Sequence, residues 1–139
     1  LFYINNMKSK ALGSLRAAQL LINSKEEQYC TASIHCSYYA VFQYMKYMLA
    51  HTDKNPISYT LQSDKTKGKD SHEYIIEQIK LRIPKPYEAR DFAQDFRVLK
   101  NDRVAADYDT RQFDIEESLE CKQRADRLIT KLKTYFGDK

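Results

Sequence analysis

The residue whose type and position most strongly suggest chemistry is Arg103. It continues a helix face whose large apolar members recur at three- and four-residue spacing: Phe92, Phe96 and Leu99. A permanently charged guanidinium on an apolar face needs a partner, because an unpaired buried charge is costly. Its planar donor fork matches the oxygens of a phosphate, so Arg103 is a candidate phosphate-binding residue.

A structural role for Arg103 is the alternative. Asp107 lies four residues later, where an ordinary intrahelical ion pair forms, and Asp126 is a second candidate partner. Lys100, one turn before Arg103, and Arg111, shortly after it, would extend a positive rim around a phosphate. We therefore name Lys100, Arg103 and Arg111 as candidate phosphate-binding residues and leave the structural interpretation open.

The three histidines, His35, His51 and His72, are far apart in the sequence. Nothing in the sequence brings any of them to Arg103, so we assign them no role. The chain has no His-x-x-x-His or Cys-x-x-Cys spacing, and we expect neither a metal ion nor a cofactor.

Five helices are expected to position these residues. Only three Gly and three Pro interrupt the 139 residues, and apolar residues recur at helical spacing between them. We predict an all-α bundle of four to five helices in a single domain spanning residues 1–139. The helices are expected over residues 8–23, 26–51, a short segment after Asp70 that ends before Pro84, 87–108, and 115–136.

The second of these helices carries apolar residues on two adjacent faces, which predicts a central position. A long loop is expected between the second and third helices, over Thr52–Lys69. This segment contains Asn55-Pro56, Gly68 and a polar run, without a sustained helical period. Asp70 followed by Glu73 is typical of a capping box at the start of the third helix.

The composition excludes several classes of protein. Hydrophobic residues make up 42% and charged residues 30%, which favours a folded over a disordered chain. No stretch approaches the roughly 20 apolar residues of a membrane span, so we expect no membrane association and a cytoplasmic protein. The net charge of +4 is too small to indicate nucleic-acid binding by itself.

Three motifs, at residues 37–42, at His72 and at residues 103–108, resemble those of HEPN domains (higher eukaryotes and prokaryotes nucleotide-binding). Ser37-Tyr38-Tyr39-Ala40-Val41-Phe42 is similar to the family's Tyr-Tyr-Ala-x-Phe signature. His72 follows a Gly- and Lys-containing loop, as a His does in many HEPN domains. Arg103-Val104-Ala105-Ala106-Asp107-Tyr108 resembles the family's Arg-x-x-Ala-Asp-Tyr pattern. The resemblance covers about residues 32–136.

The resemblance implies a helical bundle that dimerises, with the Arg motifs of two subunits facing each other. In the catalytic branch of the family, a His follows the Arg after four to six residues, and the pair cleaves RNA without metal. The ribose 2′-hydroxyl attacks the adjacent phosphate in that reaction. Residues 108 to 110 are Tyr, Asp and Thr, so the sequence resembles the branch that lacks this His. A Tyr, with an ordinary pKa of about 10, is a poor general base at neutral pH.

On this resemblance we name Arg103, Asp107 and Tyr108 as candidate catalytic residues. The expected function is binding or cleavage of RNA or nucleotides by a homodimer, in a toxin-antitoxin or defence system that includes a small nucleotidyltransferase. Some family members are nucleotidylated on a Tyr near the Arg motif, which makes Tyr108 a candidate for that modification. The alternative is a non-catalytic helical module that binds a nucleotide or a protein.

Overall fold

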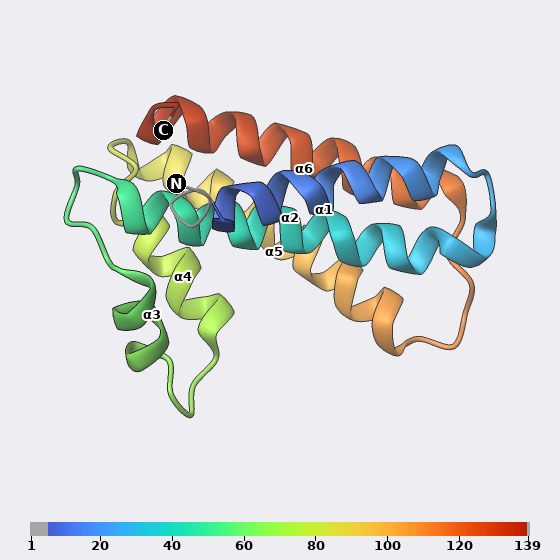
Figure 1. Ribbon diagram of the computed structural model, residues 1–139, viewed down its shortest axis with the longest axis horizontal. Coiled ribbons are helices and arrows are strands. Elements are labelled where there is room, and N and C mark those ends of the chain that lie inside the picture. Colours follow the sequence, from blue (N-terminus) through green and yellow to red (C-terminus); the bar gives the residue numbers. More distant parts are fainter. Residues whose placement is uncertain (1–5, 139) are drawn as a thin grey trace.

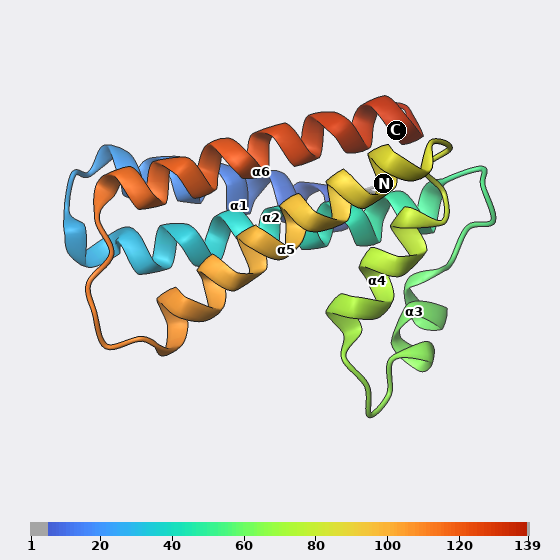
Figure 2. The same cartoon turned by 180° about the vertical axis from the view of Figure 1, so that it is seen from behind.

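Long helices lie side by side in the computed structural model, which describes residues 6–138 (Figures 1 and 2). In chain order the elements are α1 (Asn6–Asn23), the 3-10 turn η1 (Glu27–Tyr29), α2 (Cys30–His51), α3 (Tyr59–Lys65), α4 (Ser71–Lys80), α5 (Pro86–Tyr108) and α6 (Ile115–Phe136). Within the described residues there is no β-strand, and the all-α prediction is confirmed. The predicted domain of residues 1–139 also includes residues 1–5 and 139, which lie outside the described residues.

The helix α2 is the centre of the bundle, as its two apolar faces predict. The helices α1, α5 and α6 all pack along it. Its largest fully buried side chains come from both faces: Ile34, Tyr38, Tyr44, Met45, Met48 and Leu49. Burying a side chain of this kind contributes about 1.5–3 kcal/mol. The helix therefore supplies much of the core and a fixed support for the residues beside it.

The helix α5 carries the predicted apolar face. Phe92, Phe96 and Leu99 are buried, and Ala106 continues the face beyond Arg103. The helix begins at Pro86, a position where the missing N–H of proline costs nothing because the first N–H groups have no partner within the helix. Arg103 is therefore held on a helix face that packs against α2.

The segment Thr52–Lys69 is not one long loop, because it contains the helix α3. The Ser58 side chain accepts a hydrogen bond from the backbone N–H of Leu61 and caps this helix. Gln62 is buried and donates to the backbone carbonyls of Lys46 and Ile57, which ties α3 to α2. The loop prediction was wrong because a helix of seven residues with one buried side chain is too short to show a helical repeat of apolar residues in the sequence. The described part of the chain thus has six α-helices, one more than predicted.

The helix α4 begins at the predicted cap. An Asp70 carboxylate oxygen accepts a hydrogen bond from the backbone N–H of His72 at 3.0 Å. Glu73, the predicted reciprocal member of a capping box, instead accepts from Arg97 of α5 at 2.8 Å. The cap and this ion pair fix the first turn of α4 beside α5.

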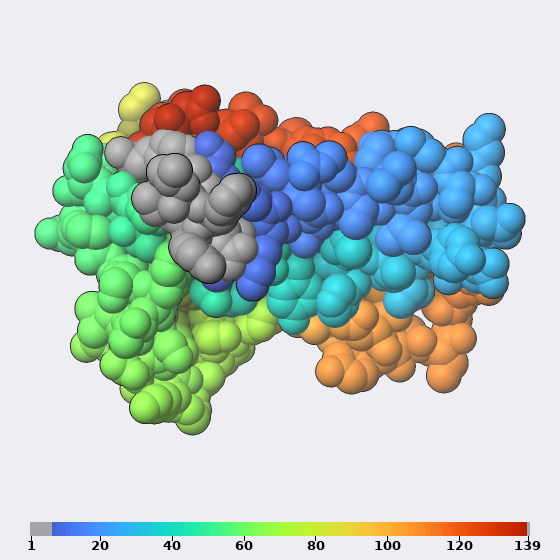
Figure 3. Space-filling model, in the orientation of Figure 1, coloured from blue at the N-terminus to red at the C-terminus, as the bar shows by residue number. Residues whose placement is uncertain are grey.

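The helices α3 and α4 form an arm at one side of the bundle (Figures 1 and 2). Figure 3 shows that the molecular surface is hollowed between this arm and the C-terminal part of α5. No helix in the described part of the chain is both long enough and apolar enough to cross a membrane.

Candidate functional site

Arg103 forms the predicted ion pair with Asp107. The Arg103 guanidinium lies 3.2 Å from an Asp107 carboxylate oxygen, and the Arg103 side chain is 12% exposed. Burial opposes the charge of Arg103, but the hydrogen bond with Asp107 and the charge interactions with Tyr39, Tyr38 and Asp107 together outweigh it, so the pKa of the guanidinium is raised. Asp126, the other candidate partner, pairs with Lys122 instead. The Nε–H of Arg103 is buried and has no hydrogen-bond partner.

The guanidinium of Arg103 lies over two tyrosine rings of α2. Its central carbon is 5.0 Å from the ring centroid of Tyr38 and 5.7 Å from that of Tyr39. The two rings meet edge to face, and Phe96 of α5 stacks against Tyr38 at 5.3 Å. Aromatic faces attract a guanidinium because the ring quadrupole is negative above the plane. The rings therefore help to hold the Arg103 guanidinium beside α2.

His72 joins this cluster from the first turn of α4. Its Nδ1 is hydrogen-bonded to the Tyr38 hydroxyl, and its ring stacks on Phe42 with centroids 4.3 Å apart. Burial lowers the pKa of His72 below its ordinary value, and the charges of Lys100 and Arg103 lower it further. Burial also raises the pKa of the Tyr38 phenol. Both groups are consequently neutral at pH 7.

His35 approaches the same cluster from the other side of Tyr39. Its Nδ1 lies 3.4 Å from the second carboxylate oxygen of Asp107, and its ring centroid is 4.6 Å from that of Tyr39. Asp107 therefore bridges Arg103 of its own helix and His35 of α2. Since His35 precedes Tyr39 by one helical turn, the two side chains lie on the same face of α2.

Lys100 supplies a second positive charge beside His72. Its ammonium lies 3.3 Å from an oxygen of Asp70, the residue that caps α4. Hydrogen bonding to the backbone and the charge of Lys100 outweigh the effect of burial and lower the pKa of Asp70. The pair links α5 to the start of α4. Lys100 and Arg103 thus lie one turn apart on α5, each paired with a carboxylate.

The structure places the other two predicted residues differently. Tyr108 is 76% exposed at the last position of α5. Arg111 lies in the loop that follows, where it pairs with Glu117 at 2.8 Å and stacks over Phe113 at 3.7 Å. Glu117 also belongs to the capping box of α6. Arg111 is therefore held by α6, whereas Lys100, Arg103 and Asp107 gather around the α2 tyrosines.

The sequence argument missed His35 and His72 as neighbours of Arg103. His35 and Asp107 are 72 residues apart, and His72 and Tyr38 are 34 apart, so helical periodicity could not relate them. The available signal was the set of three motifs described in the sequence analysis, which includes Tyr38, Tyr39, His72 and Arg103. The structure brings all three motifs together at one place.

This arrangement suits the chemistry of a phosphate. Two cations can pair with its oxygens, and a neutral imidazole can accept a proton near pH 7. Within residues 6–138 no group of three or more His, Cys, Asp or Glu side chains could hold a metal ion.

Comparison with known proteins adds no relative to this picture. No protein-family model, no curated protein and no solved structure matches the chain.

Proposed function

We propose that the chain is a HEPN-type protein that binds RNA at Arg103 and cleaves it without a metal ion. The observation that carries the proposal is the meeting of Arg103, His72 and Tyr38, which come from three different helices. Fold alone does not define function, so the proposal depends on these side chains and their contacts.

The proposed reaction is an internal transfer at one phosphate of the RNA. With its Nδ1–H donated to the Tyr38 oxygen, His72 has Nε2 free to take the proton of a ribose 2′-hydroxyl. The 2′-oxygen then bonds to the adjacent phosphorus and the bond from phosphorus to the 5′-oxygen breaks. His35 gives a proton to the departing 5′-oxygen. The products end in a 2′,3′-cyclic phosphate and a 5′-hydroxyl.

Arg103 and Lys100 stabilise the negative charge that builds up on the phosphoryl oxygens. Charged donors held in place before the reaction are effective because they need no reorganisation as the charge develops. Asp107 keeps the guanidinium in position and faces the imidazole of His35. We assign Tyr38 and Asp107 as positioning residues. Tyr108, highly exposed at the helix end, is kept as the candidate for modification by a partner nucleotidyltransferase.

The proposal extends to a homodimer acting in a toxin-antitoxin or defence system. The apolar side chains of Val98 and Val104 are partly exposed on α5, and a second copy packed on this helix would cover them. Light scattering at micromolar concentration tests this part, and a monomeric mass would contradict it.

The decisive experiment is RNA cleavage in EDTA, with mixed structured and single-stranded RNA and analysis of the fragment ends. The wild type is expected to leave 2′,3′-cyclic phosphates. Arg103→Ala and His72→Asn are each expected to reduce the rate by about 10²-fold or more. His51→Asn is the matched control, because His51 packs against Tyr47 and Tyr59 at the other end of α2. Equal cleavage by Arg103→Ala would show that the activity comes from a contaminant.

A second candidate function is a non-catalytic module that binds a nucleotide. The Arg103–Asp107 pair favours it, because Asp107 partly neutralises the guanidinium and leaves less of its charge to stabilise a phosphoryl transition state. In that case the wild type cleaves no RNA, while nucleotide binding still depends on Arg103. Nucleotide titrations of the wild type and Arg103→Ala separate the two functions.

A further inference from the structure

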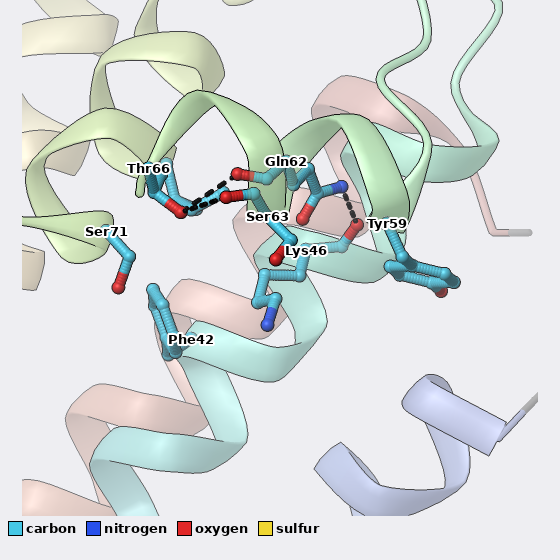
Figure 4. A pocket seen from close by; sticks show the side chains of 8 residues that line it. Phe42, Lys46, Tyr59, Gln62, Ser63, Thr66 and Ser71 are labelled. Atoms are coloured by element: carbon cyan, nitrogen blue, oxygen red, sulfur yellow. Dashed lines mark hydrogen bonds between the residues drawn. The ribbon is translucent and has the colours of Figure 1, made fainter. Parts of the chain in front are cut away.

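A cavity of about 200 Å³ lies beside the candidate site, between α2, α3 and the start of α4 (Figure 4). Its lining includes the Phe42 ring and Lys46 from α2, Gln62 and Ser63 from α3, and Ser71 from α4. The Phe42 ring also stacks on His72 at 4.3 Å. One aromatic side chain therefore belongs both to this cavity and to the surroundings of Arg103.

Gln62 leaves one polar atom of the cavity unsatisfied. The residue is 2% exposed, and its amide nitrogen donates to the backbone carbonyls of Lys46 and Ile57 at 3.1 and 2.8 Å. Its Oε1 is buried without a hydrogen-bond partner. A buried acceptor that has lost its water is unfavourable, so an N–H group of a ligand would gain from bonding there.

Donors and an aromatic face surround this acceptor. The Lys46 ammonium lies 5.5 Å from the centroid of Phe42. Figure 4 shows the Lys46 side chain and the Phe42 ring next to each other, with Gln62 and Ser63 of α3 above them and Ser71 at the side. The cavity thus combines a cation, one unpaired acceptor, the apolar side chains of Phe42 and Ile75, and the hydroxyl groups of Tyr59, Ser63, Thr66 and Ser71.

We propose that this cavity binds one nucleobase of the RNA whose phosphate lies at Arg103, an inference that rests on the proposed function. A nucleobase has N–H donors and ring acceptors on its edge, which suit Gln62 and Lys46, and an apolar ring that suits the Phe42 and Ile75 side chains of the lining. A phosphate has only acceptors and would leave Gln62 Oε1 unpaired. The volume suits a single base, since it lies below the roughly 300–1,000 Å³ of pockets for larger ligands.

Two substitutions test the cavity without touching Arg103 or His72. Ser63 is exposed on α3, so Ser63→Trp fills the cavity from its rim, and Lys46→Met removes the cation. Thr60→Trp is the matched control, since Thr60 is exposed on the same helix and outside the lining. Circular dichroism checks that each variant is folded. If Ser63→Trp is not, Lys46→Met carries the test.

The binding test titrates the four nucleoside 5′-monophosphates and ribose 5-phosphate into the protein and follows backbone amide signals by NMR. The nucleotides are expected to shift the signals of Gln62, Ser63 and Ser71, and ribose 5-phosphate is not. Loss of one stacked base corresponds to about 5- to 150-fold in affinity, so Ser63→Trp should weaken binding by at least about 5-fold. Thr60→Trp should leave it within about 2-fold, the scatter of exposed substitutions. Equal shifts with ribose 5-phosphate, or an unchanged affinity of Ser63→Trp, would overturn the base site.

The RNA cleavage assay separates this inference from the proposed function. If the wild type cleaves RNA, Ser63→Trp should raise the KM for RNA. The wild type should show a similarly raised KM for an RNA that has one abasic residue beside the cut. An unchanged KM would remove the base site and leave the cleavage proposal standing. If the wild type cleaves nothing, the cleavage proposal fails, and the nucleotide titrations still decide whether the cavity binds a base.

Discussion

The central guanidinium carbon of Arg103 lies over the ring of Tyr38, 5.0 Å from its centroid, and the hydroxyl of the same ring is hydrogen-bonded to His72. One side chain of the central helix therefore supports a cation from α5 and an imidazole from α4. Since Tyr38 is fully buried, its position is fixed by the packing of the core. The relative placement of Arg103 and His72 follows from that packing.

Tyr38→Phe is expected to slow RNA cleavage by about 10-fold or more while the ring stays under Arg103. Removal of the hydroxyl leaves His72 Nδ1 without its partner, which costs about 1–3 kcal/mol of stability and loosens the imidazole. Tyr44→Phe is the matched control, because the Tyr44 hydroxyl is buried without a hydrogen-bond partner and its loss should cost nothing. Urea unfolding and initial cleavage rates provide both measurements. If the two variants behave alike, the Tyr38 hydroxyl does not position His72.

The stability of the protein is expected to fall on mild acidification because of His72. Its folded-state pKa is lowered from 6.5 by burial first and then by Lys100 and Arg103, so the unfolded chain binds more protons. The free energy of unfolding should therefore decrease as the pH drops from about 6.5 through the folded-state pKa. Asp70 also has a lowered pKa, but from 3.8, so its effect begins at more acidic pH.

Urea unfolding followed by circular dichroism between about pH 7.5 and 5 measures this decrease. His72→Gln cannot titrate, and its stability should change less over the same range. A parallel decrease in the two proteins would contradict the low pKa of His72.

Arg103→Ala is expected to lower the free energy of unfolding by about 1–2 kcal/mol. The intrahelical pair with Asp107 contributes a few tenths of a kcal/mol, and the contact with the tyrosine rings contributes about 0.5–2 kcal/mol. Breaking a fully buried ion pair would cost about 3–5 kcal/mol, but Asp107 retains His35 and partial exposure. A loss of stability above the expected range of about 1–2 kcal/mol, together with normal RNA binding, would make Arg103 a purely structural residue.

Much of the bundle could be predicted from the sequence, because long helices repeat the three- and four-residue spacing of apolar residues over many turns. The face of Phe92, Phe96 and Leu99 predicted α5 and the position of Arg103 on it. The helix α3 could not be predicted in this way, since its support is a cap at Ser58 and the hydrogen bonds of Gln62. Such contacts depend on the position of α2, which local spacing does not encode.

The candidate site could be predicted only in part. The Arg103–Asp107 pair lies within one helix, and its i, i+4 spacing is visible in the sequence. Lys100, His72 and His35 meet their partners across helices, and their neighbours depend on how α4 and α5 cross α2. Arg111 seemed part of a positive rim by proximity in sequence, but the capping box of α6 directs it to Glu117.

Ser58→Ala is expected to destabilise α3 locally. Loss of an N-cap side chain costs about 0.5–2 kcal/mol, and a helix of seven residues has little other support. Amide hydrogen exchange should become faster over 59–65 and remain unchanged in α6. Asp114→Ala, which removes the cap of α6, is the control and should leave α3 unaffected. Uniform exchange changes across the bundle would show that α3 unfolds only with the whole domain.

Lys100 and Arg111 are expected to differ in their effect on RNA binding, although the sequence places both near Arg103. Lys100 lies near His72 and pairs with the exposed carboxylate of Asp70. Replacement of Lys100 by Ala should weaken RNA binding at low salt. It should also lower the slope of log K against log salt concentration by about 1, the effect of one lost phosphate contact. Arg111 is engaged by Glu117 and Phe113, so Arg111→Ala should change neither quantity. Fluorescence anisotropy with a labelled RNA at several salt concentrations measures both, and an equal loss of slope in the two variants would place the RNA across the α5–α6 loop instead of the hollow.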